Sequence, residues 1–351
     1  MTQICVFCAG NFLVILVVQC DRQVESKTNF LLGQLALADL CVGVFCVMQS
    51  FMAYLSNWLL GLFLCQMYLY VQALSYVASV LIMVAVCVER YVAIMQPFHT
   101  RSVFTSVRLR LIVVLVWVVS AAYAAPRLFF ARVTSQALRH STERDTFCHL
   151  DTRRYDPDAF DTANLILLYA APLIAMAAMY SRMCVELWRS GRRVPAGAAE
   201  QPGPLAARRR VVLMLMLVVL SFLLCNLPYH ARKMWQARLR SQPHLHTPSN
   251  SIYSKLFTPA TFLVMYLNSA LNPVLYVTMS RSFRRAVMRR LRLCTRSTFA
   301  PCLRCFRERQ KPASPLIGRL GASESSTRNC SAVLHPLNGH NMGPSLPETV
   351  V

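Results

Sequence analysis

Long apolar runs alternate along the chain with short polar or basic segments. The longest runs lie near residues 29–54, 65–95, 109–126, 160–184, 211–231 and 256–279, and a shorter one extends from Ile4 to Val18. Crossing a bilayer takes about 20 helical residues, so each long run can span one. The runs are continuous and lack the alternating polarity of outer-membrane strands. The pattern therefore predicts membrane-spanning helices.

The short opening run affects the number of predicted helices. It lacks the cationic start and the small-residue cleavage site of a signal peptide, so we interpret it as a first helix that is truncated at its amino-terminal side. An extracellular segment is then expected before it. The resulting fold class is an all-α membrane protein, a seven-transmembrane helix bundle.

The formal net charge of +22 would fit a nucleic-acid partner, but the distribution of the charge argues against one. Lys and Arg fall between and after the apolar runs, as topology sorting in membranes requires. Residues 21–27, 99–110, 189–210 and those after Arg281 then become cytoplasmic. We expect a multi-pass plasma-membrane protein with a cytoplasmic carboxyl terminus and no nucleic-acid partner.

A second group of cations falls on the predicted outer side of the membrane. Its members are Arg232, Lys233, Arg238, Arg240 and Lys255. Two explanations stay open: these residues recognise an acidic group of a ligand, or they belong to solvated loops without a specific function.

The predicted outer connections are residues 55–64, 127–159 and 236–255. The longest of them contains Cys148, and Cys65 comes just before the third span. Both thiols would face an oxidising exterior, where disulfides persist. Their positions favour a Cys65–Cys148 disulfide over a chance placement of two cysteines.

The segment from Ser280 to Leu293 follows the last span. Its apolar residues lie on one helical side and its arginines elsewhere, which predicts an amphipathic eighth helix in contact with membrane lipid. The apolar side consists of Phe283, Val287, Met288 and Leu291.

The chain beyond this helix has a different character. We divide it into a seven-helix domain with its membrane-surface helix at residues 1–292 and a disordered cytoplasmic tail at residues 293–351. The thiols of Cys294, Cys302 and Cys305 are palmitoylation candidates or free thiols. The last residues, Thr349–Val351, fit strand addition into a PDZ groove or match that pattern by chance.

Few strongly polar residues interrupt the spans, and such residues are functional candidates because they are costly in a membrane. Asp39 is the one acidic residue deep in a span, and Ser79, Asn268 and Asn272 could converge with it. These oxygen atoms would hold a sodium ion with water, or form only a hydrogen-bonded cluster. No other cofactor or metal is expected.

The third span carries a stripe of residues at steps of three and four. The stripe consists of Gln72, Tyr76, Ser79, Met83, Val86 and Arg90 and connects the outer half of the span to its inner end. On the sixth span Phe222, Asn226, Tyr229 and Lys233 form a similar stripe, and Pro228 is expected to kink that helix.

Short motifs occur in the spans in a specific order. They are Gly10-Asn11, LALAD ending at Asp39, Glu89-Arg90-Tyr91, Trp117, Pro172 with Tyr180, CNLPY ending at Tyr229, and NPVLY from Asn272 to Tyr276. Through them the chain resembles the rhodopsin-like (class A) G-protein-coupled receptors. Within that family, the stretches CVMQSFMAYL and CNLPYHARKMWQ resemble the arthropod trissin receptors, whose relatives include other neuropeptide receptors such as the orexin type.

The resemblance implies roles in activation and G-protein coupling for particular residues. They are Glu89, Arg90, Tyr91, Phe98, Tyr180, Phe222, Asn272, Pro273 and Tyr276. Among them, Arg90 would pair with Glu89 in the inactive receptor and meet the G protein in the active one. Asn226 stands where the family commonly has Trp. Many relatives have an acidic residue at the base of the sixth span, where this chain has residues 208–210, all arginine.

The resemblance also narrows the ligand. Gln72 stands where amine receptors have Asp, and Tyr266 where opsins have the retinal lysine, so an extracellular peptide is implied. The candidate ligand-binding residues are Gln49, Gln72, Tyr76, Tyr229, His230, Lys233, Phe262 and Tyr266. A trissin-like, cysteine-rich peptide and a Gq-type heterotrimeric G protein with calcium release are implied, with arrestin as a further partner.

Other functions remain as alternatives. An orexin-like or other neuropeptide receptor is the first, and a membrane transporter is a remote one, because no repeated half or polar pore ring is visible. An intramembrane enzyme would need a nucleophile with a base, or metal ligands, at bilayer depth. No such pair is visible, so we expect no enzyme.

Overall fold

The computed structural model describes residues 2–20, 26–47, 58, 60–97, 100–137, 144–192, 204–241, 252–280 and 283–289. They all fall in one compact unit, Met1–Thr298. Several predicted features lie outside the described residues: Gln49, Phe98, Cys294, Cys302, Cys305, Thr349–Val351 and the tail at 293–351.

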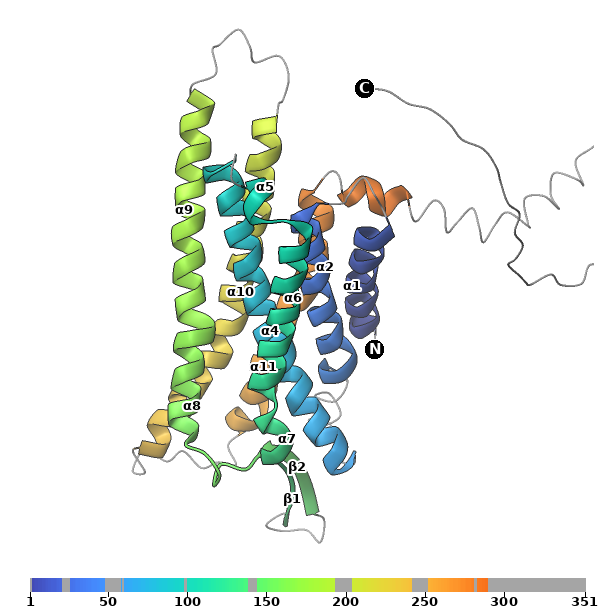
Figure 1. Cartoon of the computed structure of the whole chain (residues 1–351). Helices are drawn as coiled ribbons and strands as arrows, with labels where there is room; N and C mark the ends of the chain where they lie inside the picture. The colour runs from blue at the N-terminus through green and yellow to red at the C-terminus, as the bar shows by residue number, and fades with distance from the viewer. Residues whose placement is uncertain are drawn as a thin grey trace, which may run out of the picture. The chain divides into compact units, whose positions relative to one another are not determined.

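The described chain is mainly helical, and its long helices run side by side (Figure 1). The helices are α1 (Thr2–Cys20), α2 (Lys27–Cys41), η2 (Val42–Val47), α4 (Gly61–Met95), α5 (Thr100–Val103), α6 (Ser106–Ala124), α7 (Pro126–Phe130), α8 (Pro157–Asn164), η3 (Leu165–Ala170), α9 (Ala171–Arg192), α10 (Pro204–Ser241) and α11 (Ile252–Met279). The segments η2 and η3 are π-helical and continue α2 and α8 without a break.

The predicted spans are confirmed. Among the described residues, 6 helices are long and apolar enough to cross a membrane, and a shorter apolar helix covers Phe7–Gln19. Several helices extend past the apolar runs that predicted them. α10, for example, covers Pro204–Ser241, whereas its apolar run covers residues 211–231. The helix therefore continues beyond the apolar stretch into basic segments at both ends, and it passes through Pro228.

Polar side chains fix where several helices begin. Ser26 caps α2 by accepting a hydrogen bond from the backbone N–H of Asn29 (3.2 Å). Thr105 caps α6 in the same way through Arg108, and Asp156 accepts bonds from the first two N–H groups after Pro157 at the start of α8. These local signals position α6 and α8, both of which contribute to the site described below.

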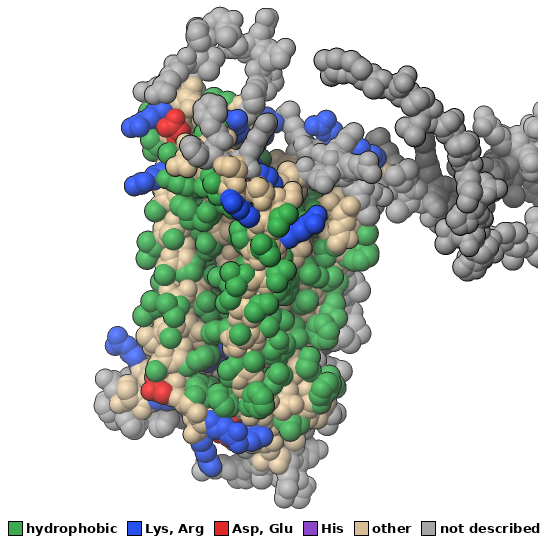
Figure 2. Space-filling view, viewed as in Figure 1, with side chains coloured by type: hydrophobic (Ala, Val, Ile, Leu, Met, Phe, Trp, Pro, Cys, Tyr) green, Lys and Arg blue, Asp and Glu red, His purple; other side chains and the backbone are tan. Residues whose placement is uncertain are grey.

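The helices pack around α4, which contacts α2, α6 and α9. The core contains fully buried apolar side chains such as Leu35, Ile82 and Met176. Outward-facing apolar side chains such as Ile174 and Val274 stay highly exposed. Figure 2 shows hydrophobic side chains over the middle of one face and Lys and Arg toward both ends. This distribution is typical of a protein whose outer surface meets lipid.

A two-stranded antiparallel sheet forms at one end of the bundle, which we call the hairpin end (Figure 1). β1 (Ala131–Ala137) pairs with β2 (Arg144–Leu150), and Val133 faces Cys148 in the register. The predicted disulfide is present: Cys148 is bonded to Cys65 of α4. From the sequence we expected only a connecting loop at residues 127–159, so the two strands and the short helix α7 were not predicted.

Close packing between α1 and α11 explains why the first motif has a glycine at position 10. A Cβ atom at Gly10 would lie 3.3 Å from the ring of Pro273 in α11.

Residues 283–289 are helical, and Phe283 and Val287 pack into the core, whereas Met288 is exposed. That this segment forms an amphipathic eighth helix on the membrane surface stays a prediction.

Candidate functional site

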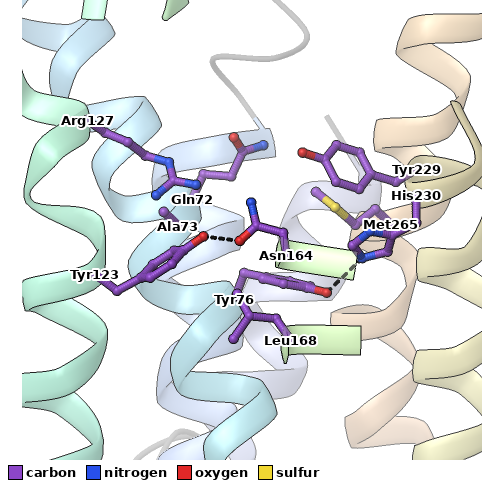
Figure 3. A pocket seen from close by; sticks show the side chains of 10 residues that line it. All are labelled: Gln72, Ala73, Tyr76, Tyr123, Arg127, Asn164, Leu168, Tyr229, His230 and Met265. Carbon is purple, nitrogen blue, oxygen red and sulfur yellow. Dashed lines mark hydrogen bonds between the residues drawn. The ribbon is translucent and has the colours of Figure 1, made fainter. Parts of the chain in front are cut away.

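A cavity opens between the helices near the hairpin end, and we call it the hairpin-end cavity (Figure 3). It contains about 460 Å³ of empty space, counting the part that is open to solvent. Its described lining residues come from seven helical elements: Gln72, Ala73, Tyr76, Tyr123, Arg127, Asn164, Leu168, Tyr229, His230 and Met265. A concave site with mainly apolar and aromatic walls and a few polar groups is typical of ligand binding.

Four of the predicted ligand-binding residues line this cavity: Gln72, Tyr76, Tyr229 and His230. Phe262 and Tyr266 lie behind its wall. The ring of Phe262 lies 5.6 Å from the ring of Tyr229, and Gln72 donates a hydrogen bond from Nε2 to the hydroxyl of Tyr266 (2.9 Å).

The sequence did not identify the other lining residues. Tyr123, Arg127 and Asn164 are the polar ones among them. Tyr123 and Asn164 interrupt apolar runs, and that signal could have identified them. Arg127 was assigned to a connecting loop, whereas α7 continues the helical path and brings it to the cavity.

Hydrogen bonds hold the polar side chains of the cavity in place (Figure 3). The hydroxyl of Tyr76 and Nε2 of His230 are 3.0 Å apart, which links α4 to α10. The hydroxyl of Tyr123 donates to Oδ1 of Asn164, which links α6 to α8. Contacts between helices therefore orient these polar groups.

Lys233 was predicted to contact the ligand, but in the structure its side chain pairs with an acid of α8. Its Nζ lies 3.3 Å from both carboxylate oxygens of Asp161, and it does not line the cavity. Arg240 pairs with Asp158 and lies 3.8 Å from Asp161. Cations of the outer group are thus neutralised by acids of α8, which neither explanation from the sequence had considered.

Arg232, another member of that group, is buried among protein groups. Its Nε donates to Oγ1 of Thr261 (3.0 Å), and its guanidinium lies 5.2 Å from the ring centre of Phe262. Arg238 is exposed, and the side chain of Lys255 lies outside the described residues.

A second cavity, the inner cavity, lies deeper in the bundle and shares Gln72, Tyr76 and Met265 with the first. Its empty space is about 380 Å³. The other lining residues are Val42, Ser75, Ser79, Phe222, Asn226, Tyr266, Asn268 and Ser269. Oγ of Ser75 and Oδ1 of Asn226 are buried there without a hydrogen-bond partner among the described residues. Asn226 therefore adds a polar wall where a Trp is common in the family.

The structure brings only part of the predicted sodium-site set into direct contact. Asn272 donates from Nδ2 to Asp39 (2.8 Å), whereas Asn268 accepts a bond from Ser221 (3.3 Å). Oδ1 of Asp39 and Oδ1 of Asn272 are buried and have no hydrogen-bond partner in the described chain. Unpaired oxygens of this kind fit a cation with oxygen ligands, and bound sodium stays a prediction.

Arg90 lies toward the other end of α4, which we call the Arg90 end. Its Nε and one terminal nitrogen donate to the two carboxylate oxygens of Glu89, both at 2.6 Å. The Glu89 side chain is only 1% exposed and also accepts a bond from the hydroxyl of Thr28 in α2 (2.8 Å). Such charge-assisted bidentate pairs are strong. The sequence had not identified Thr28.

Of the other described residues with implied roles in activation, most lie in the core. Tyr180, Phe222, Asn272, Pro273 and Tyr276 are buried, and Tyr91 is half-buried. The ring centre of Phe222 lies 6.1 Å from that of Tyr76, and both residues line the inner cavity. The hydroxyl of Tyr276 has no hydrogen-bond partner among the described residues.

Comparison with known proteins identifies the family. The model described as "7 transmembrane receptor (rhodopsin family)" matches residues 10–276. The trissin receptor of Drosophila melanogaster is 31% identical over 83% of this chain, which spans 66% of that receptor. The QRFP-like peptide receptor of Branchiostoma floridae is 27% identical over 92% of this chain and 80% of its own length, and the galanin receptor type 2 of Rattus norvegicus is 29% identical over 79% and 70%.

The motifs, the helix bundle and these matches agree with one another, and the similar proteins are receptors rather than enzymes. The chain belongs to the rhodopsin family of seven-transmembrane receptors, in its neuropeptide group.

Proposed function

We propose that this receptor binds an extracellular, cysteine-rich peptide of the trissin type in the hairpin-end cavity. We also propose that it activates a Gq-type heterotrimeric G protein, with calcium release, at the Arg90 end. The similarity to the trissin receptor supports the peptide class. We expect the cavity to receive a side chain or the terminus of the peptide, whose remainder would contact the hairpin.

The main observation that supports this proposal is that α4 runs as one continuous helix from the cavity to Arg90. Gln72 and Tyr76 line the cavity, and Arg90 lies near the other end of the same continuous helix. A peptide that binds one arrangement of α4 and α10 better than another shifts the receptor population toward it. A G protein bound at the opposite end then raises the affinity for the peptide by the same factor.

The topology follows from the same proposal. The Cys65–Cys148 disulfide favours an oxidising exterior for the hairpin end, and basic segments favour the cytoplasm for the Arg90 end and the carboxyl terminus. Arrestin and a PDZ protein at Thr349–Val351 are further proposed partners on the cytoplasmic side.

A different neuropeptide is the alternative ligand. The QRFP-like peptide receptor aligns with 92% of the chain, more than the trissin receptor does, although at lower identity. An orexin-type or galanin-type peptide belongs to the same alternative.

A calcium assay in cells that express the epitope-tagged chain tests both the ligand and the G protein. Synthetic trissin should evoke a calcium response that a Gq inhibitor removes, whereas QRFP-like, orexin and galanin peptides should be inactive. Surface staining of the tag controls for membrane insertion. Silence to trissin with a response to another peptide would overturn the ligand, and a trissin response that survives Gq inhibition would overturn the G-protein assignment.

A further inference from the structure

We propose that Arg127 and Asn164 form a carboxylate-binding subsite in the hairpin-end cavity, and that the activating peptide places one carboxylate there. This rests on the proposed function as a peptide receptor and specifies the chemistry that the peptide must present. Neither residue belonged to the ligand-binding set predicted from the sequence.

The charge of Arg127 is the first observation. Of the ten described residues that line the cavity, it is the one with a permanently charged side chain. Its guanidinium lies 5.1 Å from the ring centre of Tyr123 and 5.3 Å from that of Phe160. These rings hold the guanidinium in place but do not neutralise it.

The two acids of α8 are already engaged with other cations. Asp161 pairs with Lys233, and Asp158 pairs with Arg240. Among the described residues, Arg127 itself makes no ion pair. A charged group in a partly dehydrated cavity interacts strongly with an opposite charge, so an anionic group of a ligand is the partner that this site favours.

The orientation of Asn164 is the second observation. Its Oδ1 accepts the hydrogen bond of the Tyr123 hydroxyl, which leaves its Nδ2 as a donor. Figure 3 shows this nitrogen and the guanidinium of Arg127 on the same side of the cavity, near Gln72. Two groups of donors therefore face one space, and Tyr123 positions both of them.

The donor set selects a carboxylate among anions. A guanidinium matches the two oxygens of a carboxylate with parallel hydrogen bonds, and a neighbouring amide N–H₂ can add another. A phosphate dianion would keep excess negative charge beside a single cation. A cationic ligand group is disfavoured, because Arg127 would repel it. The aromatic rings of Tyr76, Tyr123 and Tyr229 suit the apolar part next to the carboxylate.

A double-mutant cycle between receptor and peptide tests the proposal. The receptor variants are Arg127→Gln and, as the matched control, Arg153→Gln, an exposed arginine in the loop between β2 and α8. The probes are synthetic trissin with a free carboxyl terminus, its carboxyl-terminal amide, and forms in which each Asp or Glu is replaced singly by Asn or Gln. These forms distinguish a terminal carboxylate from a side-chain one.

One of these peptide changes should lower potency about 10- to 100-fold on the wild type and on Arg153→Gln, as loss of a hydrogen-bonded ion pair does. The same change should have no further effect on Arg127→Gln. Equal potency losses on wild type and Arg127→Gln for every peptide form would overturn the proposal.

A second variant covers the case in which Arg127→Gln fails to reach the cell surface. Tyr123→Phe keeps the ring below Arg127 and removes the hydroxyl that orients Asn164. It should lower the potency of the carboxylate form of the critical peptide more than that of its neutral form. Parallel losses for both forms would contradict the positioning role of Tyr123.

Silence of the wild type to trissin would overturn the proposed ligand but would still leave this subsite testable. Thermal unfolding of the purified receptor is then compared in benzoate and in benzamide at equal concentration and ionic strength. Benzoate should stabilise the wild type and Arg153→Gln more than benzamide does, and it should lose that advantage on Arg127→Gln. Equal effects of the two probes on the wild type would refute the subsite.

Discussion

The two ends of the bundle differ in which segments their ion pairs connect. At the hairpin end, ion pairs join separate helices: Lys233 and Arg240 of α10 contact Asp161 and Asp158 of α8. At the Arg90 end, the ion pair of Arg90 joins two neighbours on α4, and no ion pair among the described residues joins α4 to α10.

This difference indicates which part of α10 is able to move. Ion pairs restrain α10 against α8 at the hairpin end. At its other end α10 is held by apolar packing and by a hydrogen bond from Arg209 to the backbone oxygen of Leu187 in α9 (2.8 Å). We therefore expect activation to move the Arg90 end of α10 more than the hairpin end.

The largest expected effect comes from removing the charge at the Arg90 end. Arg90→Ala should abolish the calcium response, because it removes the group that we propose meets the G protein. Surface expression and binding of labelled peptide at the hairpin end should persist. A normal calcium response in this variant would remove Arg90 from the coupling role.

Breaking the ion pairs at the hairpin end should reduce stability. Asp161 is 8% exposed and Lys233 28%, so Asp161→Asn leaves a half-buried ammonium without its partner and should cost about 1–2 kcal/mol. Thermal unfolding of the purified receptor measures this. The double variant Asp161→Asn with Lys233→Met should recover most of the loss.

The matched control for this change is the pair of Asp151 and Arg154, which is more exposed and joins residues of one turn. Asp151→Asn should change stability by less than about 0.5 kcal/mol. Equal losses for Asp151→Asn and Asp161→Asn would contradict the role of α8 as the restraint on α10.

Removing the hydrogen bond between Thr28 and Glu89 should have an intermediate effect, in this case on basal signalling. Thr28→Val keeps the shape of the side chain and removes one hydrogen bond to the Glu89 carboxylate, which is worth about 1.5 kcal/mol, or about tenfold in an equilibrium. Basal signalling without peptide should rise by about that factor. Thr278→Val, which loses only bonds to its own helix, should leave basal signalling unchanged.

The smallest expected effect comes from adding an ion pair between α10 and α4. Arg208→Glu places an acid at the base of α10, where many relatives have one, so that Arg90 gains a partner on another helix. Basal signalling should fall by about twofold to threefold, as exposed ion pairs are weak. Arg238→Glu, the same charge change at the other end of α10, is the control. A fall in both variants would show that the effect is one of net charge.

Local patterns sufficed to predict much of this molecule. The spans follow from apolar runs because a helix satisfies its own backbone hydrogen bonds in lipid. The pair of Glu89 and Arg90 was implied by the family resemblance, because adjacent helical residues do not face each other and only their long side chains allow the contact. Gln72, Tyr76, Tyr229 and His230 could be assigned to the cavity because motif positions fix their helix faces.

Other features depended on contacts between distant segments. The partner of Lys233 is 72 residues away, and Thr28 is 61 residues away from Glu89. Arg127 could not be assigned from the sequence, because its place depends on how α7 continues the path of α6 toward the cavity.

The sequence by itself determined which segments enter the membrane and where the basic segments lie, because both depend on the transfer of residues between water and lipid. Only the tertiary structure decided which polar groups meet inside the bundle. Helix rotation and packing bring Arg127, Tyr123 and Asn164 together from α7, α6 and α8, and Arg127 is the one permanent positive charge among the described residues that line the hairpin-end cavity.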